Sequence, residues 1–557
     1  MKIAKRWGLG LIMAAGGMSA CTSILGGFDF EGKPAGTGGT GTGGANTSSS
    51  SSSGSTSSSS SSSTSSSSST SSGTGGGGGG PVCTPDSTQT CYGGTPGTAG
   101  TGKCVVGTQT CAGDGSGWTA CSGEITPAAV DDCAAKTDDT CDGFTCGQTM
   151  WVKDVPDHSQ AKGVGVDANG NVIVAGEFTG SIDFGGSLLN SVGSDLYVAK
   201  LDPTGKHLWS KRFGGAGGAQ TVDALAVDPV GAVLVAGRLY QGATIDFGGG
   251  PITSTSGGDN SFVVKLDAQG NYVWAKLFSG NQAIYVNGLT ADPSGNAIAV
   301  GQFVGTADFG SGNTASKGYY DMFAVKLASS NGSTSWAKTF GDPNTTGTEN
   351  QYANYVAADA NGTVFVTGFG YYNVQIGNIT VVLGTSGSSI CIRLDTFGVF
   401  AGYALLSASG APSVAVDGSG NVFLTSYATG TVNFPNGGSV TSSTTPYPYV
   451  AKLDPMLNFI WGKVGYGGGA MATDATGNVI VTDQLGYAAS HLQKLDPSGN
   501  LLWDNTFGTD AIVYGLAAAP SSGRVVMAGK NTGTIDFGTG PITAPNKSDT
   551  FVVQFAP

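Results

Sequence analysis

Five aspartates within twelve residues form the densest group of potential metal ligands in the chain. Calcium takes about six to eight hard oxygen ligands, and such a cluster can supply several of them. The spacing does not match an EF-hand loop, which needs glycine at its sixth position and glutamate at its twelfth. A calcium site and a solvated acidic loop therefore both stay open, and no other cofactor is expected. The five residues are Asp131, Asp132, Asp138, Asp139 and Asp142.

The sequence offers few groups for acid–base or nucleophilic catalysis. Its three histidines, His158, His207 and His491, fall in unrelated places and form no i,i+4 pair. A histidine metal site and a Ser-His-Asp hydrolase are therefore poorly supported. Neither a Gly-x-Ser-x-Gly elbow nor a P-loop occurs in the chain. We expect a protein that is not an enzyme.

Aspartate–phenylalanine pairs recur along the chain and look like a chemical motif. One carboxylate in each of several repeats is more typical of a turn than of a catalytic site. We therefore interpret the aspartate as the lock of an Asx turn and the phenylalanine as a core residue. The pairs are Asp183-Phe184, Asp246-Phe247, Asp308-Phe309 and Asp536-Phe537.

Eight of the ten cysteines lie in one segment of the chain. An even number in a short part of an exported protein predicts four disulfides. Their pairing stays open, because eight cysteines allow about a hundred connectivities. The eight are Cys83, Cys91, Cys104, Cys111, Cys121, Cys133, Cys141 and Cys146.

The segments that must position any site are short strands. The first copy of a long repeat holds four runs rich in β-branched and aromatic residues, at 164–167, 171–178, 196–201 and 207–213. No window shows the apolar spacing of a helix. Asp-x-x-Gly turns separate the runs, as in tight hairpins. Each copy is therefore predicted to be a four-stranded antiparallel meander.

The repeat occurs seven times, which predicts a propeller or a β-array. The copies start near Gly163, Ala224, Gly288, Val356, Ser413, Ala470 and Gly515. The seventh copy has no fourth, tryptophan-bearing strand, whereas a spare strand at 150–153 precedes the first. Pairing Trp151 with the strand at 550–555 would remove two exposed edges. The sequence thus predicts an all-β, seven-bladed β-propeller at 149–557, closed by an N-terminal strand.

Tryptophans recur in the fourth strand of six of the seven predicted blades. Such a ring of large aromatic side chains is expected to pack blade against blade. The residues are Trp151, Trp209, Trp274, Trp336, Trp461 and Trp503.

The first 148 residues divide into three parts. Residues 1–20 have a basic start and a short apolar core, which is typical of an export signal. Residues 21–80 are dominated by glycine, serine and threonine and are predicted to be a disordered linker. Residues 81–148 form the small disulfide-rich module.

Met18-Ser-Ala-Cys21 resembles the lipobox of bacterial lipoproteins. The resemblance implies cleavage before Cys21 and acylation of that cysteine, which would anchor the chain in a membrane. Thr22 in place of aspartate implies the outer membrane or cell surface. An ordinary secretory signal followed by an unrelated cysteine is the alternative.

Composition limits the partners. Only 11% of residues are charged, and the formal net charge is −13. Without clusters of lysine and arginine we expect no nucleic-acid partner. Contact with a membrane is expected only through the acylated N-terminus. The disulfides favour an extracytoplasmic location.

Three further resemblances bear on function. Gly107-Thr-Gln-Thr-Cys111 and Gly115-Ser-Gly-Trp118 resemble Cys-rich modules of predicted surface proteins of myxobacteria. Tyr197-Val-Ala-Lys-Leu-Asp-Pro-x-Gly205 resembles the SBBP β-propeller repeat of bacterial surface proteins, which implies a fold and no activity. The stretch 201–209 is also similar to the tryptophan-docking repeats of quinoprotein dehydrogenases. Those enzymes usually have eight blades, pyrroloquinoline quinone and calcium, whereas this chain has seven copies and no adjacent cysteine pair.

Loops at one mouth of the ring are the expected ligand site. Aromatic and amide groups there suit a protein, peptide or glycan. We predict a binding or adhesion module, with a structural envelope protein and a quinoprotein-like oxidoreductase as alternatives. The candidate residues are His158, Asp223, Tyr285, Asn287, Tyr352, Asn354, Tyr355 and Tyr514.

Overall fold

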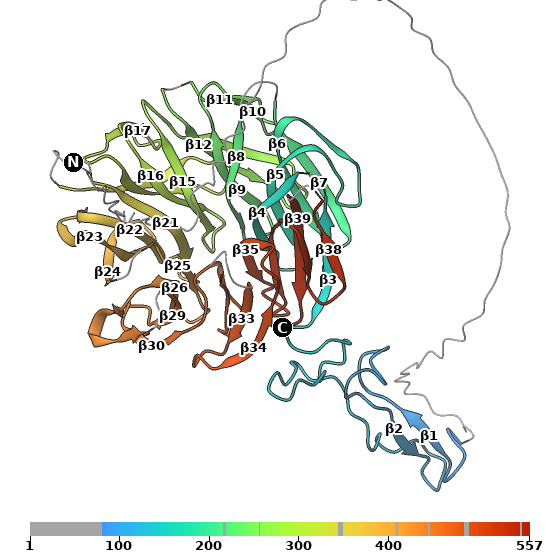
Figure 1. Ribbon diagram of the computed structural model, residues 1–557. Helices are drawn as coiled ribbons and strands as arrows, with labels where there is room; N and C mark the ends of the chain where they lie inside the picture. The colour runs from blue at the N-terminus through green and yellow to red at the C-terminus, as the bar shows by residue number, and fades with distance from the viewer. Residues whose placement is uncertain are drawn as a thin grey trace, which may run out of the picture. The chain divides into compact units, whose positions relative to one another are not determined.

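Figure 1 shows the computed structural model of the chain. It describes residues 81–557 except 157, 216–218, 256, 344–348, 408–409, 444–445, 484–489 and 546–547. The predicted signal, Cys21 and the linker lie outside the described residues. Apart from the 3-10 turn η1 (Pro435–Gly437), all the elements of the described chain are strands, which confirms the all-β prediction. Within these residues, no helix has the length and apolar character needed to cross a membrane.

The chain forms two compact units. The first contains residues 91–107 and 123–557, and the second contains the described residues 81–90 and 108–122. The strands β1 (Thr88–Cys91) and β2 (Gly107–Thr110) form a two-stranded sheet. All eight cysteines of the Cys-rich segment are disulfide-bonded, as predicted, and the bonds include Cys83–Cys111, Cys104–Cys141 and Cys133–Cys146.

Seven four-stranded sheets make up most of the described chain from residue 149 onward, and we number them 1 to 7 in chain order. Sheet 1 contains β4 (Ser159–Val166), β5 (Val172–Ile182), β6 (Leu189–Leu201) and β7 (His207–Phe213). Sheet 2 contains β8 (Gln220–Val227), β9 (Val233–Leu239), β12 (Asn260–Leu266) and β13 (Tyr272–Leu277). Sheet 3 contains β15 (Ile284–Ala291), β16 (Ala297–Phe303), β19 (Asp321–Leu327) and β20 (Thr334–Phe340).

The remaining sheets repeat this pattern. Sheet 4 contains β21 (Gln351–Ala358), β22 (Val364–Ile376), β23 (Ile379–Leu394) and β24 (Phe400–Leu406). Sheet 5 contains β25 (Ser413–Val416), β26 (Val422–Ala428), β29 (Tyr447–Leu453) and β30 (Phe459–Val464). Sheet 6 contains β31 (Met471–Thr473), β32 (Val479–Thr482), β33 (His491–Leu495) and β34 (Leu501–Thr506). Sheet 7 is β35 (Ala511–Ala518), β36 (Val525–Asn531), β39 (Asp549–Phe555) and β3 (Thr149–Val155).

Short strands decorate the loops between the second and third strands of several sheets. They are β10 (Thr244–Asp246) with β11 (Pro251–Thr253), β17 (Thr306–Asp308) with β18 (Asn313–Ala315), β27 (Thr431–Asn433) with β28 (Ser439–Thr441), and β37 (Thr534–Asp536) with β38 (Pro541–Thr543). β14 (Ser279–Gly280), which lies between β13 and β15 in the chain, also pairs with β17. The aspartates of the Asp-Phe pairs accept backbone N–H groups in the turns here, and their phenylalanines are buried. The Asx-turn interpretation is therefore confirmed.

An aspartate holds the turn between the first and second strands. Asp167 Oδ1 accepts the N–H groups of Asn169 and Asn171 at 2.9 and 3.0 Å. Lys200 Nζ on the third strand lies 2.8 Å from Asp167 Oδ2, and both side chains are buried. The same pairing recurs in four further sheets, as Lys265–Asp228, Lys326–Asp292, Lys452–Asp417 and Lys494–Asp474.

Neighbouring sheets are joined by apolar clusters and by tryptophan hydrogen bonds. Ile173 and Val198 of sheet 1 pack with Val233 and Phe262 of sheet 2. Trp209 Nε1 donates to the carbonyl of Ala268, in a turn of sheet 2, at 3.1 Å. Equivalent bonds run from Trp274 to Ser329, Trp336 to Thr396, Trp461 to Pro497, Trp503 to Pro557 and Trp151 to Pro203. The prediction that the tryptophans pack one repeat against the next is confirmed.

The strand β3 pairs with β39, as the sequence predicted. In this antiparallel register Trp151 lies opposite Gln554, and Asp154 lies opposite Phe551. The first strands of successive sheets contact one another, and β35 of sheet 7 also contacts β4 of sheet 1 (Figure 1). The arrangement is that of a β-propeller-like protein.

Asp154 makes the β3–β39 pair sensitive to pH. Its Oδ1 is buried and has no hydrogen-bond partner among the described residues. Burial, together with the charge of Asp549, raises the pKa of Asp154 to about 6. Between about pH 4, the pKa of an aspartate in the unfolded chain, and about pH 6, Asp154 is therefore protonated in the folded protein but ionised in the unfolded one. The resulting penalty grows as pH rises through this window and is complete above it.

We expect Asp154→Asn to raise the free energy of unfolding above pH 7 by about 1 kcal/mol, a value reduced for partial exposure to solvent. Below pH 4 the variant and the wild type should be equally stable. Thermal unfolding of both proteins from pH 4 to 8 measures this difference. A difference that does not change with pH would contradict the assignment.

Candidate functional site

The recurring residues of the seven sheets and their variable residues occupy different places. An Asp-x-x-Gly turn follows the first strand in six of the seven sheets, and Ala519-Pro-Ser-Ser-Gly523 takes its place in sheet 7. At the opposite end, near the start of the first strand, equivalent positions hold different side chains. A residue that recurs from sheet to sheet is explained by the fold alone. A position that holds different polar side chains in different sheets is not explained by the fold alone. The variable end is therefore the candidate site.

A β-bulge near the start of the first strand presents one extra residue in each of five sheets. The register shifts by one residue around each of them, and such bulges re-aim side chains. The five residues are Lys162, Asp223, Asn287, Asn354 and Tyr514. Four of them were predicted from the sequence, whereas Lys162 was missed.

Glycine in the second strand makes each bulge possible. A Cβ at Gly176 would lie 2.0 Å from the carbonyl oxygen of Gln160, which is closer than any real contact. A Cβ at Gly237, Gly301, Gly368 or Gly529 would likewise lie 1.8–2.2 Å from a carbonyl oxygen of the first strand. Ser426 and Asp483 occupy this position in sheets 5 and 6, and the described pairs there have no register shift.

The residue after this position varies like the bulge residue. It is Glu177, Arg238, Gln302, Phe369, Tyr427 and Lys530 in the six sheets where it is described. We call these six residues and the five bulge residues the variable belt. None of the six was predicted. Aligning the five repeats that carry the glycine would have found five of them, because the next residue differs in all five copies.

Charged residues, together with Tyr514, make up the part of the belt in sheets 1, 2 and 7. Arg238 donates two hydrogen bonds to Asp223, at 2.8 and 2.9 Å. Glu177 accepts the side-chain amide of Gln160 at 3.1 Å and the N–H of Val222 at 3.0 Å. Lys162 Nζ lies 4.6 Å from the ring centre of Tyr514.

Burial shifts the pKa of three of these groups. It raises the pKa of Glu177 and of Asp223, and in both cases the positive charge of Lys162 opposes the shift. Burial and the charge of Lys162 lower the pKa of Lys530. The charges here are therefore held against a desolvation cost, as at many binding sites.

Tyrosines and amides make up the part of the belt in sheets 3 and 4, together with its neighbours. The ring of Tyr320, which precedes β19, lies 6.0 Å from the rings of both Tyr285 and Tyr352. Asn287 Nδ2 donates to Gln302 Oε1 and, at 2.9 Å, to the carbonyl of Ala353. The side-chain oxygen of Asn354 is buried and has no hydrogen-bond partner among the described residues. Tyr320 was missed because it lies outside the four strand runs of the repeat.

The other predicted binding residues lie beside the belt. Tyr285 and Tyr352 precede the bulges and pair with Gln302 and Phe369. Tyr355 follows a bulge residue, at the position of Gly163 in sheet 1. His158 is exposed, has a φ of 52° and lies immediately before β4.

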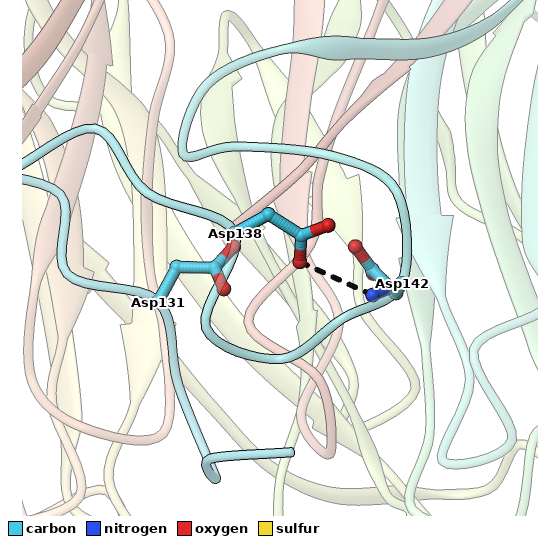
Figure 2. Close-up of side chains that lie close together, drawn as sticks. All are labelled: Asp131, Asp138 and Asp142. Atoms are coloured by element: carbon cyan, nitrogen blue, oxygen red, sulfur yellow. Dashed lines mark hydrogen bonds between the residues drawn. The ribbon is translucent and has the colours of Figure 1, made fainter. Parts of the chain in front are cut away.

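The acidic cluster gathers three of its five aspartates. Ligand atoms of Asp131, Asp138 and Asp142 all lie within 4.8 Å of one another (Figure 2). Asp131 Oδ1 also accepts the N–H groups of Asp139 and Thr140, and Asp138 accepts that of Asp142. These bonds are those of an acidic loop locked by its own backbone, and calcium binding stays a prediction.

The remaining two aspartates of the cluster have other partners. Asp139 lies 2.6 Å from Lys103, and a hydrogen bond from this lysine lowers the pKa of Asp139 to about 2. Asp132 accepts the N–H groups of Ala134 and Ala135.

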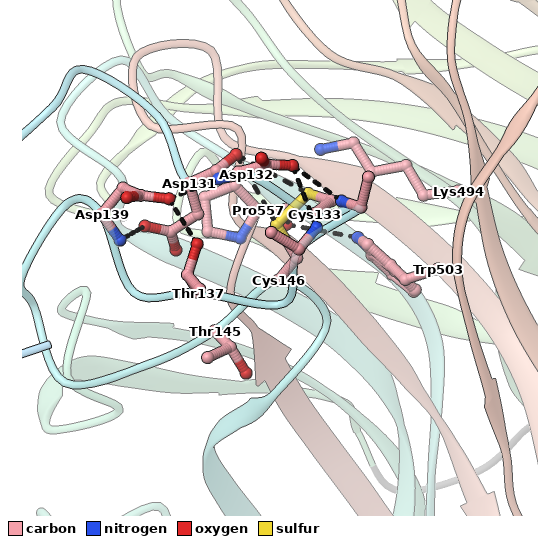
Figure 3. The surroundings of a disulfide bond; sticks show 12 residues. Asp131, Asp132, Cys133, Thr137, Asp139, Thr145, Cys146, Lys494, Trp503 and Pro557 are labelled. Atoms are coloured by element: carbon pink, nitrogen blue, oxygen red, sulfur yellow. Dashed lines mark hydrogen bonds between the residues drawn. A yellow bond between two sulfur atoms is a disulfide. The ribbon is translucent and has the colours of Figure 1, made fainter. Parts of the chain in front are cut away.

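The disulfide Cys133–Cys146 ties this loop to sheets 6 and 7. Figure 3 shows the bond beside Trp503 and Pro557. Both cysteines pack against the apolar cluster that contains Trp503 and Phe555. Gly147 donates its N–H to the carbonyl of Ala556 at 3.3 Å, directly before β3 begins. The disulfide therefore holds the entry to the β3–β39 pair.

Two surface clefts lie away from the belt. One, of about 420 Å³, is lined by Asp167, Trp209 and Val230 between sheets 1 and 2. The other, of about 400 Å³, is lined by Tyr403, Leu405 and Phe434 between sheets 4 and 5. Neither contains a residue that was predicted for ligand binding.

No family model and no curated protein matches the chain. Similar solved structures include the quinohemoprotein alcohol dehydrogenase from Comamonas testosteroni, with 12% identity, 72% of this chain and 76% of that chain covered, and a TM-score of 0.33. NanB with Optactamide is 9% identical, with 73% of this chain and 68% of that chain covered and a TM-score of 0.34. The polysaccharide lyase Uly1 is 11% identical, with 72% of this chain and 90% of that chain covered and a TM-score of 0.39.

Proposed function

We propose that this protein is a membrane-anchored binding module of the cell surface, and that the variable belt is its ligand site. One observation carries the proposal. No two of the five bulged sheets carry the same pair of belt residues, whereas the glycine that admits each bulge recurs in all five. The fold thus needs the bulge but not the side chain that the bulge presents, so the polar side chains there serve another purpose.

The seven sheets are, in this proposal, the blades of one closed propeller. The pairing of β3 with β39, the contact of β35 with β4 and the bond from Trp151 to Pro203 support it. Closure would bring the belt residues of sheets 7 and 1 next to each other. The attraction of Lys162 to the ring of Tyr514 is consistent with this.

The membrane anchor comes from the sequence. Acylation at Cys21 and the linker up to residue 80 would hold the folded part away from the lipid surface. A flexible chain of this length reaches on the order of 40 Å from its anchor. Such a tether suits a module that meets ligands outside the membrane.

The test compares two double variants of the full chain. Lys162→Gln/Lys530→Gln changes both belt lysines, and Lys206→Gln/Lys211→Gln makes the same change of charge on the turn before β7 and on β7. Each protein is used to capture partners from envelope extracts, and recovery is quantified. We expect the belt variant to lose its partner about tenfold or more, since Lys162 acts on the buried Glu177 and Asp223, and Lys530 is itself partly desolvated. The control should retain the partner.

Two results would contradict the proposal. One is equal recovery of every partner by both variants. The other is no partner above background with the wild type, which would favour a structural envelope protein instead.

A further inference from the structure

The belt amides of sheets 3 and 4, together with the tyrosines beside them, have the chemistry of a carbohydrate site. Tyr319 and Tyr320 lie along the entry to β21: the N–H of Tyr319 donates to the carbonyl of Glu349 at 3.0 Å, and the N–H of Gln351 donates to that of Tyr320 at 2.8 Å. This pairing brings two tyrosines from outside the repeat pattern next to Tyr352. We call Tyr285, Tyr319, Tyr320 and Tyr352 the tyrosine group.

The tyrosine group presents an aromatic surface. The ring centres of Tyr319 and Tyr320 are 4.8 Å apart, with the ring planes at 86°. Tyr319 is 53% exposed, whereas Tyr320 touches Tyr285 and Tyr352 on either side. An exposed tyrosine backed by half-buried ones is a rigid platform whose face a ligand can cover at a small entropic cost.

Three acceptor oxygens beside this platform have no donor. They are Glu349 Oε2, Asn350 Oδ1 and Asn354 Oδ1, all buried and without a hydrogen-bond partner among the described residues. A buried acceptor left unsatisfied costs about 1–3 kcal/mol. Three of them within six residues of one chain segment point to a ligand that donates hydrogen bonds.

The neighbouring charges decide which donor fits. Arg238 already places its guanidinium carbon 5.3 Å from the ring centre of Tyr285, so a second cation would be repelled. Glu349 and the free acceptor oxygens disfavour an anion. Burial raises the pKa of Tyr285 and Tyr352, so their hydroxyl groups stay protonated. An uncharged ligand rich in hydroxyl donors is the remaining class.

We propose that the tyrosine group and Asn354 bind a neutral carbohydrate. The C–H face of a pyranose ring would cover Tyr319, and its hydroxyl groups would donate to the free oxygens of Asn350 and Asn354. This inference rests on the proposed function, because it names the ligand class of the same belt.

Calorimetric titration of the full chain tests the proposal. The probes are neutral oligosaccharides (cellohexaose, mannohexaose, xylohexaose and chitohexaose), with polygalacturonate and a chitosan oligomer as charged counterparts. We expect at least one neutral probe to bind. Tyr319→Ala and Asn354→Ala should each weaken binding about tenfold, or 1.4 kcal/mol. Tyr319→Phe should retain binding, because stacking does not need the hydroxyl group.

Tyr403→Ala, which removes an exposed tyrosine from the outer strand β24, is the matched control and should bind like the wild type. Binding of charged probes only, or neutral binding that survives both Tyr319→Ala and Asn354→Ala, would overturn the inference. If no carbohydrate binds while Lys162→Gln/Lys530→Gln still loses a captured partner, the carbohydrate assignment fails and the binding module stands. If neither assay detects a ligand, both fail.

Discussion

Replacing Lys200 with methionine should lower the free energy of unfolding by about 3–5 kcal/mol, the usual cost of removing one partner from a buried ion pair. Asp167 would keep its turn but lose the lysine 2.8 Å away, in a place where its side chain is only 4% exposed. Burial alone would raise the pKa of Asp167, and the hydrogen bonds from Lys200 and Asn171 lower it below its ordinary value. The loss of stability that Lys200→Met causes should therefore be smaller at acidic pH than at neutral pH.

The measurement is thermal unfolding of the full chain. For a cooperative unit of about 400 residues, 3 kcal/mol corresponds to a Tm decrease of roughly 3–4 °C. Lys206→Met, which removes an exposed lysine six residues away, is the matched control and should change little. Adding Asp167→Asn to Lys200→Met should recover part of the loss, because no charge is then buried. Equal effects of Lys200→Met and Lys206→Met would contradict the role assigned to the pair.

Removing the Cys133–Cys146 disulfide should destabilise sheet 7 by about 2–4 kcal/mol. The bond closes a loop of 13 residues, and its sulfur atoms pack on the cluster of Trp503 and Phe555. The strand β3 starts three residues after Cys146. We therefore expect Cys133→Ser/Cys146→Ser to loosen the β3–β39 pair before other strands.

Hydrogen exchange of the backbone amides from 149 to 155 measures this effect. Exchange there should become faster in the double variant, while strands of sheets 2 and 3 stay protected. Cys83→Ser/Cys111→Ser is the control: it opens a longer loop, with a separation of 28 residues, but in the second unit. Similar exchange at β3 in the two double variants would show that the disulfide does not hold the entry to that strand.

Local chemistry explains how much of the fold could be predicted from the sequence. Asp167 and Gly170 act within five residues, so their turn is visible in the chain itself. The pairing of Trp151 with the last strand could be predicted because the repeat lacks one strand at one end and has one to spare at the other. Both inferences use only the order of residues.

The candidate site depends on contacts that the order of residues does not contain. A bulge at Lys162 forms because Gly176 lets the carbonyl of Gln160 approach to 2.0 Å from where a Cβ would be. Tyr320 reaches Tyr352 through a pairing across about 30 residues. The disulfide partner of Cys133 is likewise chosen by packing on sheet 7 and not by spacing.

The position of β3 has a consequence for how this protein is made. Thr149 pairs with Phe555, so the first strand of the repeat region leaves the ribosome about 400 residues before its partner. At roughly 5–20 residues per second, the edge of β3 stays unmatched for about 20–80 s of synthesis. Lys153 and Asp154 place charges on this edge, and charged edges resist pairing with other chains. The same aspartate that weakens the finished sheet would thus protect the nascent chain from aggregation.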